Sequence, residues 1–287
     1  MNISFKLNKY SKNIYSQYGE DGIIEYIIET SIIPINKNSI EFGAHDGISN
    51  SNTYNLYLNH SFKSLLIETN NAHIDSIKSK YLEKDRVNVM NEHITPRGNN
   101  SINNLIKKNG LFSKENVGVL SIDIDSYDYY ILKYLEFKPQ IIIIEFNNSF
   151  PSHIDYVDPE GEVYLRCSPK AIESLANKKG YKVVCVTVTN CILLREDCFD
   201  ANKHPNLPIE YLRDYEGMHK NNDHLFSIIH SQSYTTYPIS TKPLNKLDSL
   251  YFKVSRFIMS LLKLRRERFV RPSKNIKNSL KKSGLYF

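Results

Sequence analysis

Four consecutive isoleucines constrain the fold of this chain more than any other feature. They occupy positions 141–144, within the segment Pro139–Phe146. A continuous run of β-branched residues is typical of a strand that is buried on both faces, as in a parallel sheet covered by helices. We therefore expect a central strand here, with helices packed on both sides of its sheet.

Shorter apolar runs and stretches of helical periodicity alternate along the rest of the chain. The other predicted strands are Ser39–Phe42, Ser64–Ile67, Val87–Asn91, Val117–Ile124, Tyr181–Val188 and Cys191–Arg195. The predicted helices are Gly19–Glu29, Thr53–Asn59, Asn71–Tyr81, Ser101–Lys108, Tyr127–Leu135 and a helix from Ser168 to Gly180. This order predicts an open α/β sheet, parallel with an antiparallel edge strand, whose ligands bind at the carboxyl ends of the strands.

The composition excludes several classes of protein. The 287 residues are 41% hydrophobic and 24% charged, which is the composition of a globular domain with a real core. The four cysteines form no C-x-x-C pair, so we expect neither a disulfide scaffold nor a structural zinc site. No uncharged run approaches the roughly 20 residues of a membrane-spanning helix, and the polar N-terminus does not resemble a signal peptide. We predict a cytoplasmic protein.

One glycine-containing turn carries the most functional information. Residues 41–47 read Glu-Phe-Gly-Ala-His-Asp-Gly, between a predicted strand and a predicted helix. Gly43 and Gly47 let the backbone turn sharply and approach a ligand without an intervening Cβ. Glu68 ends the next strand about 20 residues later, where a carboxylate can accept hydrogen bonds from both hydroxyls of a ribose. A tight loop and a solvated strand end would explain each feature alone, but together they favour a nucleoside ligand.

An ordered set of segments resembles the FkbM-like S-adenosylmethionine-dependent methyltransferases over about residues 15–196. The segments are SQYGEDGIIEYI (16–27), SIEFGAHDG (39–47), SNTYNL (51–56), LLIE (65–68), LSIDID (120–125) and IIIIEFN (141–147). The resemblance implies a class I, Rossmann-like fold that uses S-adenosylmethionine for O-methylation, often of sugars in surface polysaccharides, glycolipids or related natural products.

The same resemblance implies roles for individual residues. Glu41, Gly43 and Gly47 would form the cofactor turn, and Glu68 would hold the ribose. Glu20 would lie near the methionine end of the cofactor, together with Gln17 and Asp21. The complete set of predicted cofactor-binding residues is Gln17, Asp21, Glu41, Gly43, His45, Gly47, Glu68 and Asp123.

Carboxylates and amides at two neighbouring strand ends suggest a divalent cation. Asp123 and Asp125 close the fourth strand, and Asn147 follows Glu145 at the end of the fifth. Hard oxygen ligands of this kind suit Mg²⁺ or Ca²⁺, so Asp123, Asp125 and Asn147 are the predicted metal ligands. The alternative is purely structural: Asp125 or Ser126 caps the next helix, with Asp128 in its first turn.

Methyl transfer to a hydroxyl also needs a group that removes the proton. Imidazole titrates near neutrality, so histidines after the third and fifth strands are candidates. In order of preference, His153, His93 and His45 are the possible bases, with Asp125 as a further catalytic candidate. The segment 146–167 is long, polar and aromatic, and we expect it to help form the acceptor pocket.

The basic charge of the chain is concentrated in its last 47 residues. Residues 241–287 contain 13 Lys and Arg against two acidic residues, a net of +11, whereas residues 1–240 carry 24 basic and 29 acidic residues, a net of −5. A helical apolar stripe over Leu247–Leu262 carries Lys253, Arg256 and Lys263 outside it. Such a helix packs on its own domain, docks a partner protein or lies on the inner face of an anionic membrane. Nucleic acid is the least favoured partner.

These observations divide the chain into a lead-in at 1–38, a methyltransferase domain at 39–230 and a basic tail at 241–287. The predicted function is O-methylation of a hydroxyl on a sugar or glycan. Two alternatives stay open: a non-catalytic glycan-binding or assembly protein that keeps the fold, and a nucleic-acid methyltransferase. The second is weakened by the sequence EFNNSFP after the fifth strand, which lacks the paired prolines of amino-methylating DNA enzymes.

Overall fold

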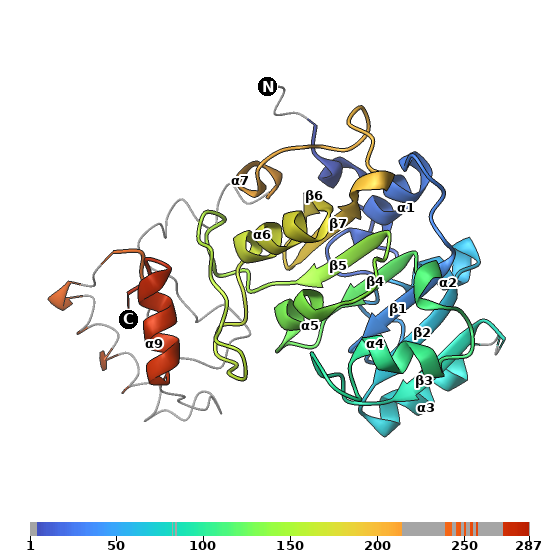
Figure 1. Cartoon of the computed structure of the whole chain (residues 1–287), viewed down its shortest axis with the longest axis horizontal. Coiled ribbons are helices and arrows are strands. Elements are labelled where there is room, and N and C mark those ends of the chain that lie inside the picture. The colour runs from blue at the N-terminus through green and yellow to red at the C-terminus, as the bar shows by residue number, and fades with distance from the viewer. Residues whose placement is uncertain are drawn as a thin grey trace. The chain divides into compact units, whose positions relative to one another are not determined.

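Strands from most of the chain form one sheet in the order β3-β2-β1-β4-β5-β7-β6 (Figure 1). They are β1 (Asn38–Phe42), β2 (Lys63–Glu68), β3 (Val87–Asn91), β4 (Val119–Ile122), β5 (Ile141–Glu145), β6 (Tyr181–Val186) and β7 (Asn190–Arg195). The structure is a computed structural model that describes residues 5–81, 83, 85–213, 239–242, 245–247, 250, 253–254, 257 and 272–286. β1 to β5 pair in parallel, whereas β7 is antiparallel to both β5 and β6. This arrangement confirms the predicted open, Rossmann-like α/β sheet.

The isoleucine run forms β5 in the interior of the sheet. Ile141 pairs with Val119 of β4 on one side and with Leu194 of β7 on the other. All four isoleucines are completely buried. Ile141 and Ile143 pack in one apolar cluster with residues of the first helix, so this face of the sheet is covered by helix. The prediction of a strand buried on both faces is confirmed.

The helices follow the predicted pattern with small shifts of their ends. They are α1 (Glu20–Thr30), α2 (Tyr54–His60), α3 (Asn71–Lys80), α4 (Ile102–Leu105), α5 (Asp128–Tyr134), α6 (Pro169–Lys179), α7 (Ile209–Leu212) and α9 (Lys274–Lys282). Short 3₁₀ turns occur at Leu7–Tyr10, Ile106–Lys108, Lys114–Asn116 and Glu196–Cys198. The predicted helix Ser101–Lys108 is thus a short α4 followed by a 3₁₀ turn. α3 starts where the side chain of Asn70 accepts a hydrogen bond from the backbone N–H of Ala72 (2.9 Å).

The chain divides into two compact units. The first, which we call the sheet unit, contains Met1–Phe146 and Ile172–Asp214. The second, the loop–tail unit, contains Asn147–Ala171 and Tyr215–Phe287. The predicted lead-in therefore belongs to the same unit as the sheet. The long segment after β5 belongs to the other unit.

The loop–tail unit has an apolar core of its own. Its buried residues come from the segment after β5 and from the end of the chain: Phe150, Ile154, Tyr156, Tyr164, Leu165, Ile239, Ile276, Leu280 and Leu285. Helix α9 begins at Ser273, whose side chain accepts a hydrogen bond from the backbone N–H of Ile276 (3.2 Å). The sequence analysis did not predict α9. The helix predicted over 247–262 lies mostly outside the described residues.

Candidate functional site

The turn after β1 brings three strand ends together, and Gly43 makes this contact possible. Its backbone N–H donates to Ile67 O at the end of β2 (3.1 Å). A Cβ at this position would lie 2.1 Å from Asp123 O, just beyond β4, and the φ of +62° also favours glycine. Only glycine fits between these backbones. The turn therefore sits against both neighbouring strands at the carboxyl edge of the sheet.

Gly47 closes the same turn against α3. With a φ of +79°, it has no room for a side chain, because a Cβ would lie 2.8 Å from Ile77 Cγ1 and 3.0 Å from Tyr81 Cε2. The Tyr81 hydroxyl donates a hydrogen bond to Gly47 O (2.8 Å). The backbone N–H of Gly47 donates to Ala44 O (2.7 Å), which completes the turn. The two predicted glycines thus fix both ends of a five-residue bend.

Glu68 holds the middle of this turn from the end of β2. Its Oε2 accepts a hydrogen bond from the backbone N–H of His45 (2.9 Å), and its Oε1 accepts from the N–H groups of Thr69 (2.8 Å) and Asn70 (2.9 Å). The side chain is mostly buried. Glu68, at the end of β2, is therefore bonded directly to the turn that Gly43 and Gly47 bound. Oε2 receives one of these bonds, so it keeps a lone pair for a further donor.

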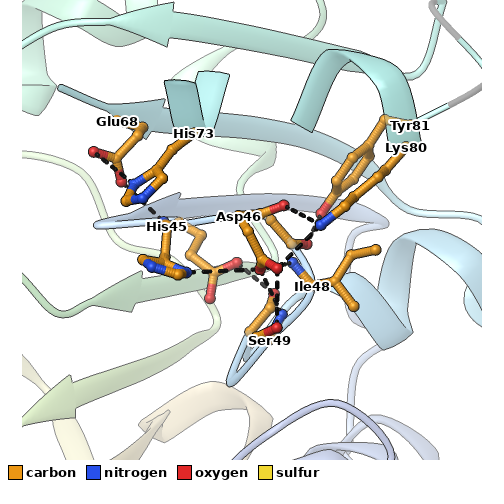
Figure 2. A network of polar contacts seen from close by, with 11 residues as sticks. His45, Asp46, Ile48, Ser49, Glu68, His73, Lys80 and Tyr81 are labelled. Atoms are coloured by element: carbon orange, nitrogen blue, oxygen red, sulfur yellow. Dashed lines mark hydrogen bonds and ion pairs between the residues drawn. The ribbon is translucent and has the colours of Figure 1, made fainter. Parts of the chain in front are cut away.

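Two histidines flank the Glu68 carboxylate, as Figure 2 shows. His73 on α3 places its Nδ1 atom 3.8 Å from Glu68 Oε1, and within the described part of the chain this buried nitrogen has no hydrogen-bond partner. The His45 ring lies against the His73 ring, with centroids 4.2 Å apart. The His45 side chain itself is 62% exposed. The sequence analysis named His45 and did not name His73, which an i+5 spacing from Glu68 at a helix start could have indicated.

Asp46 makes the outer part of the turn rigid (Figure 2). Its Oδ1 accepts from the N–H groups of Ile48 (3.0 Å) and Ser49 (2.7 Å), and its Oδ2 accepts from Lys80 Nζ (3.0 Å). Burial alone would raise the pKa of this carboxyl, but these hydrogen bonds outweigh it and hold the pKa well below its usual range. The turn is locked to α3 by a charged pair.

Glu41 on β1 is completely buried and organises the loop that leads into α2. Its carboxylate accepts hydrogen bonds from Ser51 Oγ (2.7 Å), the backbone N–H of Asn52 (2.8 Å) and Thr53 Oγ1 (2.7 Å). Burial raises its pKa, the three hydrogen bonds oppose this, and the charge of Asp21 adds to the increase. Glu41 was predicted to form the cofactor turn. In the structure its carboxylate instead binds residues 51–53 of the loop before α2.

Asp21, in the first turn of α1, holds the preceding loop against the same region. Its Oδ2 accepts from the N–H groups of Ile14 (2.9 Å), Tyr15 (2.7 Å) and Ser16 (2.7 Å). Its Oδ1 is buried and has no hydrogen-bond partner among the residues that the structure describes. The Tyr15 ring packs edge-on against Tyr54 (4.7 Å between centroids), in the cluster that also contains Ala44 of the glycine turn. The lead-in segment therefore lies beside the turn.

The other two residues predicted near the methionine end differ from Asp21. Glu20 is completely buried, and its Oε1 accepts from Thr187 Oγ1 (2.6 Å) and Asn190 Nδ2 (3.0 Å). Its carboxylate therefore ties α1 to the β6–β7 connection. Gln17 is exposed in the loop before α1.

Three carboxylates meet at the ends of β4 and β5. Asp123, Asp125 and Glu145 each offer a ligand oxygen, and these atoms lie within 4.8 Å of one another. Asp125 has a φ of +57°, a conformation that Asp tolerates better than most residues. Asp128 accepts hydrogen bonds from the N–H groups of Ile124 (2.8 Å) and Ser126 (3.1 Å). The alternative that Asp125 or Ser126 caps the helix is wrong, because Tyr127 is the N-cap residue of α5, whereas Asp128 lies in the first turn as that alternative expected.

Asn147, His153 and His93 complete the predicted metal and base residues. Asn147 belongs to the loop–tail unit, where its Oδ1 accepts from the N–H of Ser149 (2.9 Å) and its Nδ2 donates to Leu165 O (3.1 Å). His153 is exposed in the same unit, and His93 is exposed just after β3. The structure groups Glu145 with the two aspartates. Glu145 is the last residue of β5, so its position at the strand end was visible in the sequence.

Solved structures with low sequence identity resemble part of this chain. No family model matches the chain, and no curated protein matches its sequence. A SAM-dependent methyltransferase from Aquifex aeolicus is 14% identical over 65% of this chain and 94% of its own, with a TM-score of 0.37.

Two further solved structures resemble this chain over part of its length. An O-methyltransferase from neocarzinostatin biosynthesis, in complex with S-adenosyl-L-homocysteine, is 12% identical over 55% of this chain and 49% of its own, with a TM-score of 0.34. A glycopeptide N-methyltransferase complexed with sinefungin is 10% identical over 63% of this chain and 87% of its own, with a TM-score of 0.36. TM-scores this far below 0.5 carry no argument about ligand or reaction.

Proposed function

We propose that this chain is an S-adenosylmethionine-dependent methyltransferase that methylates a hydroxyl group. One observation carries the proposal. Three features lie around the carboxyl edge of one class I sheet. They are the turn at Gly43 and Gly47, which admits no side chain, the Glu68 carboxylate from the adjacent strand, and the buried Asp21 Oδ1, which has no partner among the described residues. Ligands of open α/β sheets bind at this edge.

The groups on the turn suit the nucleoside half of the cofactor. Glu68 would accept hydrogen bonds from the ribose hydroxyls, because Oε2 keeps a lone pair beside the N–H of His45. Gly43 and Gly47 would let the backbone approach the sugar closely. The other predicted contacts here are His45 on the turn and Asp123 at the end of β4.

Asp21 suits the methionine half. A buried carboxylate oxygen without a partner is costly, and an ammonium group is the strongest donor that could satisfy it. The α-amino group of S-adenosylmethionine supplies such an ammonium. Asp21 Oδ1 would hold it, while Oδ2 keeps its three backbone N–H bonds and fixes the loop at 14–16. Gln17, exposed on the same loop, is the predicted neighbour.

When bound, the cofactor would supply an electrophilic methyl group on its sulfonium, with S-adenosylhomocysteine as the leaving group. The chain's part is to hold the acceptor on that line and to remove its proton. Asp123, Asp125 and Glu145 are the carboxylates best grouped for this role. They would either accept the proton, with Asp125 the most exposed of the three, or hold a divalent cation such as Mg²⁺ with the hydroxyl.

The acceptor and the base complete the proposal. The resemblance of the sequence to FkbM-like enzymes supports a sugar or glycan acceptor. His93 and His153 are exposed and remain candidate bases, and Asn147 remains a candidate ligand from the loop–tail unit. A non-catalytic glycan-binding protein is the alternative that the same fold would allow.

Calorimetric titration of the Asp21→Asn variant tests the cofactor assignment. Asp21→Asn should weaken S-adenosylmethionine at least roughly tenfold and leave 5′-methylthioadenosine, which lacks the amino acid portion, within about twofold. Glu68→Gln should weaken both ligands. If Asp21→Asn weakens both ligands equally, or neither, Asp21 does not hold the methionine end.

The metal question needs a separate measurement. If a cation is held by the carboxylate group, release of S-adenosylhomocysteine in the presence of a sugar acceptor should stop in EDTA and return with Mg²⁺. Full activity in EDTA would leave Asp123, Asp125 and Glu145 as proton acceptors only.

A further inference from the structure

The basic tail carries an exposed apolar stripe that the methyltransferase fold does not use. Of residues 246–257, the structure describes 246, 247, 250, 253, 254 and 257, and all of these are helical. Leu247, Leu250, Val254 and Phe257 are 79%, 59%, 47% and 65% exposed. Their spacing of three, four and three residues places them on one face of a helix. Single exposed apolar residues are ordinary, but a contiguous exposed row is typical of an interaction surface.

The charge around this stripe has one sign. Lys246 and Lys253 are exposed beside it, and residues 241–287 contain 13 basic against two acidic residues. An apolar face flanked by lysines complements a surface that is apolar within and anionic outside. A polyanion such as RNA offers no apolar phase for Leu250 or Phe257. A bilayer that contains anionic lipid offers both.

Helix α9 adds exposed positive charge, whereas its apolar residues are buried in the protein. Its apolar residues Ile276 and Leu280 are already buried in the core of the loop–tail unit. Its lysines Lys274, Lys281 and Lys282 point away from that core and are exposed. α9 is therefore a folded cationic helix, whereas Leu247, Leu250, Val254 and Phe257 are exposed. No helix in the described part of the chain is long and apolar enough to cross a membrane.

We propose that the tail binds the surface of a membrane that contains anionic lipid. The side chains of Leu247, Leu250, Val254 and Phe257 lie in the boundary between headgroups and acyl chains, and Lys246 and Lys253 lie at the level of the phosphates. The exposed lysines of α9 add long-range attraction to the same surface. This surface is independent of the cofactor site, and it would bring the enzyme to acceptors carried on lipids.

Vesicle co-sedimentation of the full chain tests the stripe. We expect binding to vesicles of phosphatidylcholine with phosphatidylglycerol that is roughly tenfold tighter than to phosphatidylcholine alone and that weakens with salt. The variant L247Q/L250Q/V254Q/F257Q should lose at least about tenfold in affinity. The matched control I32Q/L58Q/V163Q/Y211Q replaces four apolar residues that are similarly exposed elsewhere, and it should bind as the wild type does.

A second pair of variants tests the charge contributed by α9. K274Q/K281Q/K282Q should weaken binding to the anionic vesicles by roughly tenfold or more, because three lysines that attract the anionic surface are removed together. K37Q/K63Q/K107Q removes three exposed lysines of the sheet unit and should have little effect.

Three results would overturn the proposal. The first is a wild-type chain that binds no vesicles, which would leave the stripe to a protein partner. Equal binding to neutral and anionic vesicles, or equal binding by the wild type and the stripe variant, would overturn it as well.

Titration of the same variants with S-adenosylmethionine separates this proposal from the proposed function. The stripe variant should keep wild-type affinity for the cofactor. A chain that binds vesicles without binding the cofactor would contradict the proposed function alone.

Discussion

At the scale of single residues, the sequence predicted the turn better than the roles of the acids around it. Gly43 and Gly47 could be predicted because a strand followed by a turn needs residues that tolerate positive φ. The hydrogen bonds of Glu41 to residues 51–53 could not, because they depend on which loop folds beneath the strand. His73 was not predicted, although its position five residues after Glu68, at the start of a helix, was visible in the sequence. Its distance from Glu68 depends on how α3 packs on β2.

Replacing Gly43 by alanine should disrupt the turn. Its Cβ would meet Asp123 O at 2.1 Å, and neither backbone can retreat without moving a strand end. Gly98→Ala is the matched control, since Gly98 also has a positive φ (+87°) and nothing lies within 4 Å of the added Cβ. We expect Gly98→Ala to cost about 1–2 kcal/mol of unfolding free energy and Gly43→Ala about 2 kcal/mol more.

Urea unfolding followed by circular dichroism measures both variants. Gly43→Ala should also lose affinity for S-adenosylmethionine, whereas Gly98→Ala should retain it. Equal effects of the two substitutions on stability and binding would show that the close approach of Gly43 to the β4 end is not needed.

At the scale of elements, helices and strands were predicted well where a periodic apolar pattern defines them. The run 141–144 and the apolar face of α1 are examples, because burial requires the same period that the sequence displays. Element ends were less accurate. The predicted strand Val117–Ile124 ends at Ile122, since Asp128 binds the backbone N–H of Ile124 and turns the chain. Such side chain–backbone bonds leave no periodic trace in a sequence.

The end of α1 is fixed by a buried histidine, and this makes stability depend on pH. His204 is almost completely buried, its Nδ1 accepts from the N–H of Asp200 (3.0 Å), and its Nε2 lies 3.0 Å from Thr30 Oγ1. Nδ1 is therefore an acceptor and the ring is neutral. Burial lowers the pKa of His204, although the charge of Asp200 opposes this. Because the pKa of His204 is lowered in the folded state, the neutral ring contributes stability above the unfolded-state pKa of about 6.5. This contribution is lost as the pH falls below that value.

His204→Gln removes this titration. At pH 7.5 the variant should be about 1–2 kcal/mol less stable than the wild type, because two buried hydrogen bonds are perturbed. As the pH falls from 7.5 to 5, the wild type should lose stability faster, so the difference should shrink. His93→Gln, at an exposed position, should track the wild type throughout. Parallel curves for wild type and His204→Gln would contradict the assignment.

At the scale of the whole molecule, the sequence did not predict how the chain divides. The segment after β5 was predicted to help form an acceptor pocket, and the tail was treated as a separate basic region. In the structure residues of both segments share one apolar core. A cluster that joins residues so far apart in the chain, such as Tyr156 and Leu280, has no local sequence pattern. The tail's charge, by contrast, could be counted directly.

Leu280→Ala should therefore destabilise the segment 150–165 although it lies more than a hundred residues away. Leu280 is completely buried, and loss of its side chain should cost about 2–5 kcal/mol within the loop–tail unit. Hydrogen exchange should accelerate in the amides of 154–165 and leave those of β4 and β5 unchanged. Asn278→Ala, on the exposed side of α9, should change neither. Unchanged protection of 154–165 in Leu280→Ala would contradict a shared core.

Calorimetric titration of the wild-type chain with S-adenosylmethionine tests the central claim most directly. The account predicts one cofactor per chain, at micromolar affinity, with S-adenosylhomocysteine competing for the same site. Absence of heat and of competition at millimolar cofactor would contradict it, and would favour a binding protein that keeps the sheet without the reaction.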